Sequence, residues 1–231
     1  MSYFSIAIDG PAAAGKSTIA KKVAKELNFT YIDTGAMYRA VTLYVLNKGL
    51  DPKDEELSCS LIDEINIVLD SSNRVFLNGN DVTKDIRLRN VADNVSYIAS
   101  YKKIRLFLVE QQRKMAETSS VVMDGRDIGS YVLPNADVKI YQVASVEKRA
   151  QRRYDENLSK NIECTYEEVE KELRKRDHID SSRDFAPLTK ASDAIEVDTS
   201  NMSIDEVVDK MLNIIRERIG DKLWVNLQYV L

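Results

Sequence analysis

The stretch IDGPAAAGKSTIAKK, residues 8–22, decides the fold of this chain. A glycine stands at each end of an alanine run, and a lysine and two hydroxyl residues follow. The apolar run YFSIAID, residues 3–9, predicts a strand before this loop, and the pattern from Lys16 to Asn28 predicts a helix after it. Small residues let successive backbone N–H groups converge on one anion, and the start of a helix adds to the favourable field. The stretch therefore predicts an anion-binding loop between a strand and a helix.

The loop fits the phosphate-binding pattern G-x-x-x-x-G-K-S/T and indicates a site for a nucleoside triphosphate. We expect Lys16 to reach the β- and γ-phosphates and the Ser17 hydroxyl to face a magnesium ion. A turn of small residues that only packs a strand on a helix is the alternative, which the lysine and the hydroxyl disfavour. The predicted nucleotide-binding residues are Gly10, Pro11, Ala12, Ala13, Ala14, Gly15, Lys16, Ser17 and Thr18.

The composition is that of one domain with insertions. The chain has 231 residues, of which 44% are apolar, and its net charge of −4 disfavours a dedicated nucleic-acid binder. No apolar run is long enough to cross a bilayer, and residues 1–9 lack the pattern of a signal peptide. Cys59 and Cys164 have no partner at metal-ligand spacing, so we expect reduced thiols in a cytoplasmic monomer.

Strand-like runs alternate with helical patterns along most of the chain. This alternation predicts an α/β fold with a parallel sheet flanked by helices. The middle differs, because residues 64–83 show two alternating strands around a short polar turn. We expect a small antiparallel insertion at about residues 63–90. The other predicted strands are residues 30–32, 119–124, 137–144 and 193–198, with a second helix at 37–48 and a highly charged segment at 145–183.

Two further segments place polar residues at strand ends. DTGAMYR, residues 33–39, follows the second predicted strand; Asp33 or Thr34 can cap the next helix, and Arg39 can direct its guanidinium to a second phosphate. DGRDIG, residues 124–129, follows the most apolar strand, where an open α/β sheet places ligand-facing groups. Asp124 is then expected to act on magnesium through water. For Asp124 or Asp127 alone, a helix cap or a surface ion pair would be the favoured interpretation, but the two glycines next to these aspartates at the end of an apolar strand favour a site.

A phosphate loop by itself does not define a reaction, because GTPases, motors, helicases and small-molecule kinases all share it. The NKxD pattern of GTPases is absent, and the chain has no basic track for a nucleic acid. A small-molecule kinase or a nucleotide-binding regulator that hydrolyses ATP slowly remain.

Six motifs together resemble the bacterial cytidylate kinase family: IAIDGPAAAGKST, DTGAMYRA, VADNVSYIA, DGRDIG, RAQRR and KRDHIDSSRDFAPL. They stand in order, and the similarity extends over about residues 6–215. The resemblance implies phosphoryl transfer from ATP, with Mg2+, to CMP or dCMP. It also implies a single kinase domain, residues 1–231, with a nucleoside monophosphate-binding insertion at roughly 36–100 and a mobile lid at roughly 149–183. A kinase for UMP or dTMP is the nearest alternative.

The resemblance also implies roles for individual residues in the acceptor site. Arg39 and Arg126 would hold the acceptor phosphate, whereas Ser96, Arg105 and Asp127 would face the cytosine. Cytosine presents an amino donor and ring acceptors, which a carboxylate and donor side chains match. The implied substrate-binding residues are Thr34, Tyr38, Arg39, Ser96, Arg105, Arg126, Asp127, Arg176, Asp180 and Arg183.

The lid would supply arginines to the polyphosphate. Arg149 and Arg153 are four residues apart, so on a helix they share a face and could meet one ligand. For Arg152, a solvated helix surface explains the sequence almost as well. The chain has Ile179 where the family often has another arginine, and the segment 220–231 receives no assignment. The implied catalytic residues are Lys16, Arg126, Arg149 and Arg153.

Overall fold

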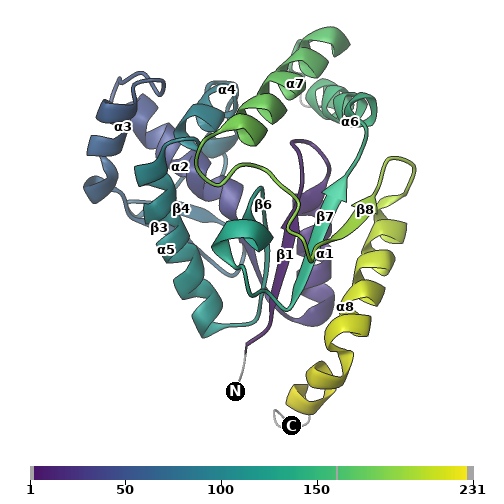
Figure 1. The fold of residues 1–231 in the computed structure, drawn as a ribbon. Helices are drawn as coiled ribbons and strands as arrows, with labels where there is room; N and C mark the ends of the chain where they lie inside the picture. The colour runs from purple at the N-terminus through teal and green to yellow at the C-terminus, as the bar shows by residue number, and fades with distance from the viewer. Residues whose placement is uncertain (1–2, 160, 228–231) are drawn as a thin grey trace.

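The computed structural model describes residues 3–159 and 161–227, with side chains as far as residue 220. Its centre is a five-stranded sheet in the order β2-β6-β1-β7-β8, in which all neighbouring strands are parallel (Figure 1). The predicted parallel sheet is thus confirmed. The strands are β1 (Ser5–Asp9), β2 (Thr30–Asp33), β6 (Val121–Gly125), β7 (Val138–Val143) and β8 (Ile195–Asp198).

Both faces of this sheet are covered by helices. Ile6 and Ile8 of β1 pack against α1 (Lys16–Leu27) and α8 (Ile204–Leu227) on one face. Ala7 points to the other face, where it meets Val109 of α5 (Lys102–Thr118) and the turn η3 (Ile128–Val132). A strand buried on both faces reads as a continuous apolar run, as β1 and β6 do in the sequence. Polar residues at their carboxyl ends are therefore left to face the open edge of the sheet.

The loop from β1 to α1 has a backbone that only glycine tolerates at one position. Gly10 has φ of +147°, and a Cβ atom there would lie 2.0 Å from the Gln142 carbonyl oxygen. Gly15, with φ of +89°, leads directly into α1 at Lys16. The predicted strand, loop and helix are thus confirmed, and the helix ends one residue before the predicted Asn28.

The helix α2 (Thr34–Asn47) begins three residues before the predicted start at residue 37. Its cap explains the difference, because the Asp33 carboxylate accepts a hydrogen bond of 2.8 Å from the Ala36 N–H. Of the two caps that the sequence allowed, the structure uses Asp33. This start brings Thr34 and Arg39 onto the first two turns of the helix, beside the end of β2.

The central insertion has three strands rather than the predicted two. They are β3 (Ile67–Leu69), β4 (Val75–Leu77) and β5 (Asn80–Asp81), paired antiparallel in that order. The prediction of one strand through residues 74–83 is wrong because the chain turns at Asn78 and Gly79, with φ of 50° and 84°. Asn-Gly is the pair that a tight two-residue hairpin favours, since both residues tolerate positive φ.

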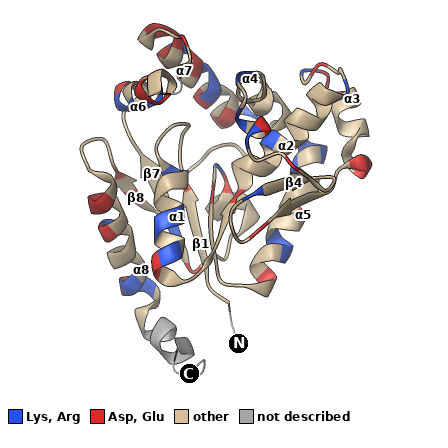
Figure 2. Ribbon diagram, turned by 180° about the vertical axis from the view of Figure 1, so that it is seen from behind, with Lys and Arg blue, Asp and Glu red and all other residues tan. Residues whose placement is uncertain are grey.

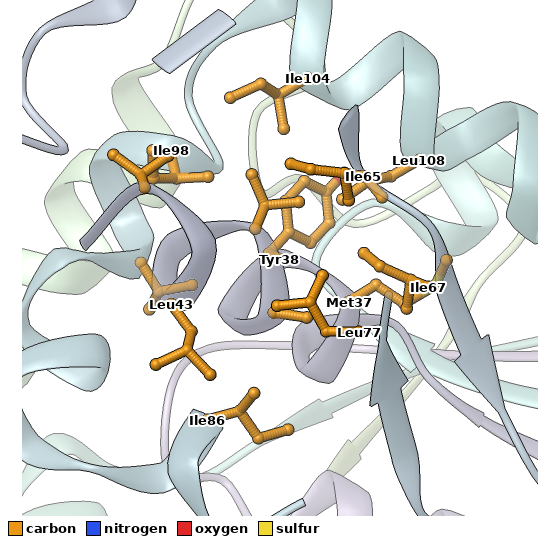
Figure 3. Close-up of a cluster of buried hydrophobic side chains, with 14 of the residues drawn as sticks. Met37, Tyr38, Leu43, Ile65, Ile67, Leu77, Ile86, Ile98, Ile104 and Leu108 are labelled. Carbon is orange, nitrogen blue, oxygen red and sulfur yellow. The ribbon is translucent and has the colours of Figure 1, made fainter. Parts of the chain in front are cut away.

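The small sheet shares a second core with the helices around it. Figure 3 shows Met37 of α2, Leu77 of β4, Ile86 and Leu108 in one cluster of buried hydrophobic side chains. These side chains are at most 5% exposed. The insertion is therefore packed onto α2 and α5 as a continuous body. The remaining elements of this region are α3 (Glu55–Ser60), η1 (Ile62–Glu64), η2 (Asp85–Arg87) and α4 (Arg89–Ile98).

The charged segment forms two helices, α6 (Val146–Ser159) and α7 (Tyr166–Ser182), which lie together beyond the carboxyl ends of the sheet strands (Figure 1). Acidic and basic residues are interspersed along both helices (Figure 2). The unassigned tail continues α8 to Leu227, and residues 228–231 lie outside the described part of the chain. Across 3–159 and 161–227, no helix is long and apolar enough to span a membrane.

Candidate active site

A cleft of about 580 Å³ lies at the carboxyl edge of the large sheet. The loop after β1, the start of α2, the residues after β6, and the helices α4, α6 and α7 all contribute to its walls. Most of the predicted site residues meet there although they come from segments far apart in the sequence. Those lining the cleft are Ala13, Ala14, Gly15, Lys16, Ser17, Thr18, Thr34, Tyr38, Arg39, Ser96, Arg105, Asp124, Arg126, Asp127, Arg153, Arg176, Asp180 and Arg183.

Lys16 is folded back over the loop. Its ammonium group donates a hydrogen bond of 2.7 Å to the Pro11 carbonyl oxygen, and the residue is only 5% exposed. Burial lowers the pKa of Lys16, and the neighbouring charge of Arg126 lowers it further, whereas Asp124 and Asp9 act in the opposite direction. A buried cation beside a loop of small residues at the start of a helix is an electrostatic environment that a polyphosphate matches.

Asp124 and Ser17 lie against each other at the floor of the cleft. The Ser17 hydroxyl donates to one carboxylate oxygen of Asp124 at 2.9 Å, and the Tyr31 hydroxyl donates to the other at 2.7 Å. Burial raises the pKa of Asp124, as does Asp33, whereas Lys16 lowers it. Serine and aspartate oxygens are ligands that suit a hard divalent cation. Sequence analysis missed Tyr31, and its place on β2, beside β6 in the sheet, is the only signal that could have revealed it.

We call the part of the cleft away from the phosphate loop the acceptor half, after the monophosphate that the sequence predicts there, and it is built from arginine–aspartate pairs. Arg39 donates to both carboxylate oxygens of Asp33 at 3.0 and 3.2 Å, and Arg126 donates to Asp180 at 2.8 Å. Burial and the charge of Arg126 lower the pKa of Arg176 to about 10. The Nε atoms of Arg39 and Arg176 are buried without a hydrogen-bond partner in the described part of the chain. This half of the cleft thus keeps N–H groups available for an anion.

The far end of the acceptor half centres on Asp127. The Asp127 carboxylate pairs with Arg105 and lies 3.4 Å from a guanidinium nitrogen of Arg183. Arg105 also donates to the Ala99 carbonyl oxygen at 2.9 Å. The Arg105 and Asp127 side chains are 1% and 6% exposed. Tyr38 packs beneath the Arg105 guanidinium, at 5.5 Å from its ring centroid. A dry pocket with one carboxylate between two guanidinium groups can match a flat group that carries both donors and acceptors.

The lid arginines are arranged differently from the expected pair. Arg153 lines the cleft, but Arg149 is buried beneath the phosphate loop, where it donates to the Ala12 carbonyl oxygen at 3.0 Å. Arg152 also lines the cleft and donates to the Thr199 carbonyl oxygen at 2.7 Å. The two arginines that share this part of the cleft wall are therefore Arg152 and Arg153. A catalytic role for Arg149 stays a prediction.

Two polar residues that the sequence analysis did not single out hold the site together. The carboxylate of Asp9 accepts hydrogen bonds from the N–H groups of Ile128 and Gly129 at 2.8 and 2.7 Å. Burial raises the pKa of Asp9 to about 7, although these two hydrogen bonds lower it. Gln142 donates its side-chain amide to the Ala14 carbonyl oxygen. Asp9 directly precedes Gly10 at a strand end, which is the sequence signal that could have identified it.

Comparison with known proteins assigns the architecture to a family. The profile described as cytidylate kinase matches residues 6–217. The chain belongs to the cytidylate kinase family. The resemblance drawn from the six motifs is thereby confirmed. Among curated relatives, the cytidylate kinase of Pediococcus pentosaceus is 53% identical over 215 residues, covering 92% of this chain and 95% of that protein. The cytidylate kinase of Limosilactobacillus reuteri is 54% identical over 216 residues, with the same coverage of both chains.

A solved structure supports the fold independently of sequence. An uncharacterized protein from Eubacterium ventriosum is similar with a TM-score of 0.52 and 16% identity, covering 94% of this chain and 100% of that chain. At this identity the similarity concerns the fold alone. The cytidylate kinase family assignment therefore depends on the sequence relatives.

Proposed function

We propose that this protein transfers the terminal phosphoryl group of ATP to CMP or dCMP, giving ADP and CDP or dCDP. The observation that carries the proposal is the position of Asp127 in the same cleft as the phosphate loop, between the guanidinium groups of Arg105 and Arg183. One end of the cleft suits a triphosphate, and the other suits a cytosine ring. Membership of the cytidylate kinase family supports the choice of acceptor.

The transfer needs no nucleophile from the protein. Phosphoryl transfer depends mainly on the alignment of donor and acceptor and on neutralising charge on the transferred group. The amides of the phosphate loop and Lys16 hold the donor phosphates. Arg39 and Arg126 lie on the acceptor side and bind the monophosphate, which places its oxygen in line with the donor. Exchange of their aspartate partners for a phosphate keeps these guanidinium groups in charged hydrogen bonds.

Ser17 and Asp124 are the residues that fit a magnesium ion. Their oxygens already lie 2.9 Å apart beside the buried ammonium group of Lys16. Among residues 3–159 and 161–227 no three histidine, cysteine or acidic side chains form a metal cluster, so phosphate and water would complete the coordination. The ion supplies positive charge to the phosphate oxygens when bound. Tyr31 orients the Asp124 carboxylate from the opposite side.

We propose that residues 149–183, which include most of α6 and all of α7, act as a lid over the cleft. Its apolar support in the described structure is a small cluster of Ala12, Ala150, Val169 and Leu173. A segment with little buried apolar surface opens easily, and ligand contacts order it. We expect hydrogen exchange across residues 157–182 to slow when a two-substrate analogue binds. Equal exchange rates with and without the analogue would contradict a moving lid.

The decisive experiment is an ATP-dependent assay with CMP, dCMP, UMP, dTMP and AMP compared side by side. We expect rapid ADP formation that requires an acceptor and is fastest with CMP or dCMP. Faster turnover of UMP or dTMP would replace the acceptor, and slow ADP formation that no monophosphate accelerates would indicate a regulator rather than a kinase.

A further inference from the structure

Both lid helices, α6 and α7, form hydrogen bonds to the backbone of one residue of the phosphate loop, Ala12. The Ala12 N–H donates to the Asp177 carboxylate of α7 at 3.0 Å, and the Ala12 carbonyl oxygen accepts from Arg149 of α6 at 3.0 Å. Arg149 and Asp177 also pair with each other at 2.6 Å. Three residues thus form a closed ring of hydrogen bonds that includes both backbone polar atoms of one loop residue. We call Ala12, Arg149 and Asp177 the loop clamp.

The loop clamp has apolar support and little contact with solvent. Ala12 is 1% exposed and packs with Ala150 of α6 and with Val169 and Leu173 of α7. The Arg149 guanidinium is fixed further by a hydrogen bond of 2.9 Å from its Nε to the Ala144 carbonyl oxygen. The Arg149 and Asp177 side chains are 8% and 22% exposed, and a charge-assisted pair that also bonds the backbone restricts both side chains to one geometry. The position of α7 is therefore tied to the backbone of the phosphate loop.

The same helix carries side chains of the acceptor half. Arg176 and Asp180 lie within one turn of Asp177 and line the cleft, and Asp180 accepts from Arg126 at 2.8 Å. Although burial opposes the effect, Arg126 and Arg176 hold the pKa of Asp180 below its usual value. In Figure 1 the loop between β1 and α1 rises toward α6 and α7. A shift of the loop would consequently move the acceptor-binding side chains through the clamp.

We propose that Asp177 and Arg149 are positioning residues that couple donor binding at the phosphate loop to acceptor binding by α7. The inference rests on the proposed function for the identity of the two nucleotides. A bound triphosphate fixes the loop backbone, the clamp transmits that geometry to α7, and the acceptor then meets Arg176 and Asp180 already in place. Coupling between two sites is reciprocal, so the acceptor tightens donor binding by the same factor.

The test is the affinity of the accepted monophosphate with and without a saturating non-hydrolysable ATP analogue and Mg2+, measured by titration calorimetry. In the unmodified protein we expect the analogue to tighten monophosphate binding by about 5- to 150-fold. In Asp177→Ala this ratio is expected to fall close to one. Affinity for the analogue alone should change much less, because Asp177 is not part of the cleft lining. If Asp177 had a merely structural role, its removal would change the monophosphate affinity by the same factor with and without the analogue, and the ratio would stay the same.

Two further variants keep the test decisive. Asp177→Asn keeps an oxygen for the Ala12 N–H and loses the charge opposite Arg149, so its ratio is expected to fall several-fold even if the alanine variant does not fold. Glu172→Ala is the matched control on the same helix, where Glu172 makes a surface ion pair with Arg89 at 3.5 Å. Its ratio should equal that of the unmodified protein.

Coupling as strong as in the unmodified protein in both Asp177 variants would overturn the inference, and so would a ratio of one in the unmodified protein. Failure of the proposed function has a different signature, because it appears in the assay with five monophosphates. The titration then uses whichever monophosphate that assay identifies, and its outcome for the loop clamp is judged separately.

Discussion

The donor and acceptor halves of the cleft hold charge in different ways. The donor half consists of consecutive residues of the loop that leads into α1, and the Lys16 ammonium group bonds back onto this loop. The acceptor half consists of guanidinium and carboxylate side chains from separate elements, such as Arg39 with Asp33 and Arg105 with Asp127. Backbone recognition depends on one local conformation, whereas side-chain recognition depends on the relative placement of several helices and strands.

The difference has a consequence for how each half responds to substitution. In the donor half, most of the anion field comes from peptide groups and cannot be removed one side chain at a time. In the acceptor half, several arginines pair with aspartates, so removal of one member leaves a charge without its partner; the paired arginines are Arg39, Arg105, Arg126 and Arg183. Substitutions in the donor half therefore test chemistry, whereas substitutions in the acceptor half test selectivity and binding.

The largest effect is expected for Lys16→Ala. This variant lacks the cation directed at the transferred phosphoryl group, and turnover should fall by about 10²- to 10³-fold, as with loss of one preorganised transition-state donor. Circular dichroism and the melting temperature should remain close to those of the unmodified protein. Lys22→Ala is the matched control, since Lys22 lies on the same helix but makes a surface ion pair with Asp205. Unchanged turnover in Lys16→Ala would refute the assignment of the donor half.

Base selection in the acceptor half is tested by Asp127→Ala. A carboxylate accepts from the amino group of cytosine, but uracil places a carbonyl oxygen there, so two hydrogen-bond acceptors face each other. A buried acceptor that lacks its hydrogen bond costs about 1–3 kcal/mol, which corresponds to selectivity of about 5- to 150-fold. We expect kcat/KM to fall steeply for CMP and hardly to change for UMP, so the ratio between the two nucleotides narrows.

The same variant also leaves Arg105 and Arg183 without their shared carboxylate, and a lower melting temperature is expected. Both nucleotides are measured on one variant, so this loss of stability does not affect their ratio, and ATP affinity serves as the control. If the ratio of CMP to UMP kcat/KM stays at its original value, base selection depends on other residues, with Ser96 and Arg105 as the next to test.

Arg39→Ala should weaken CMP binding by about tenfold to a hundredfold, as expected for one charged hydrogen-bond donor to phosphate. ATP affinity should remain nearly constant, because Arg39 lies on the acceptor side with Asp33. Titration calorimetry with each nucleotide measures both values. A loss confined to ATP, or shared equally by the two nucleotides, would move Arg39 out of the acceptor half.

The smallest effect concerns Asp9, which joins the two halves by bonding the η3 backbone from the end of β1. Burial raises the pKa of Asp9 to about 7, above the ordinary value of about 4 for an unfolded chain. The folded protein thus binds the Asp9 proton more tightly than the unfolded chain does. The stabilisation from this proton is therefore complete below about pH 4 and is lost as pH rises through 7. The side-chain amide of an Asp9→Asn variant does not titrate, whereas Lys16 and Asp127, which also influence Asp9, are common to both proteins.

The difference in melting temperature, Asp9→Asn minus the unmodified protein, should therefore be lower at pH 5 than at pH 8. The difference between the two pH values is expected to be on the order of 5 °C, since about 1 kcal/mol shifts melting by a few degrees at this chain length. Calorimetric melting curves at both pH values measure it. A difference that is the same at both pH values would show that Asp9 does not titrate in this range.

The sequence by itself determined the donor half and the main sheet. The phosphate loop is contiguous in the sequence, and the small side chains between Gly10 and Ser17 fix its conformation. Gly10 has a positive φ and a backbone neighbour so close that no Cβ atom fits there. Apolar strand runs and helical periodicity likewise depend on near neighbours in the chain. The third strand of the insertion was also encoded locally, by Asn78 and Gly79, but the alternating pattern of residues 74–83 concealed it.

Tertiary structure decided which charged side chains meet. Arg149 and Arg153 share a helical periodicity, yet burial beneath the loop separates Arg149 from the cleft, and Asp177 becomes its partner from another helix. Tyr31, Asp9 and Gln142 bond to residues that lie 93, 119 and 128 positions away in the chain. Spacing along a sequence specifies the relative positions of side chains only within one or two turns of a helix or a few residues of a strand. Contacts across the sheet depend on packing of the whole core, because a buried polar group requires a partner from whichever element packs beside it.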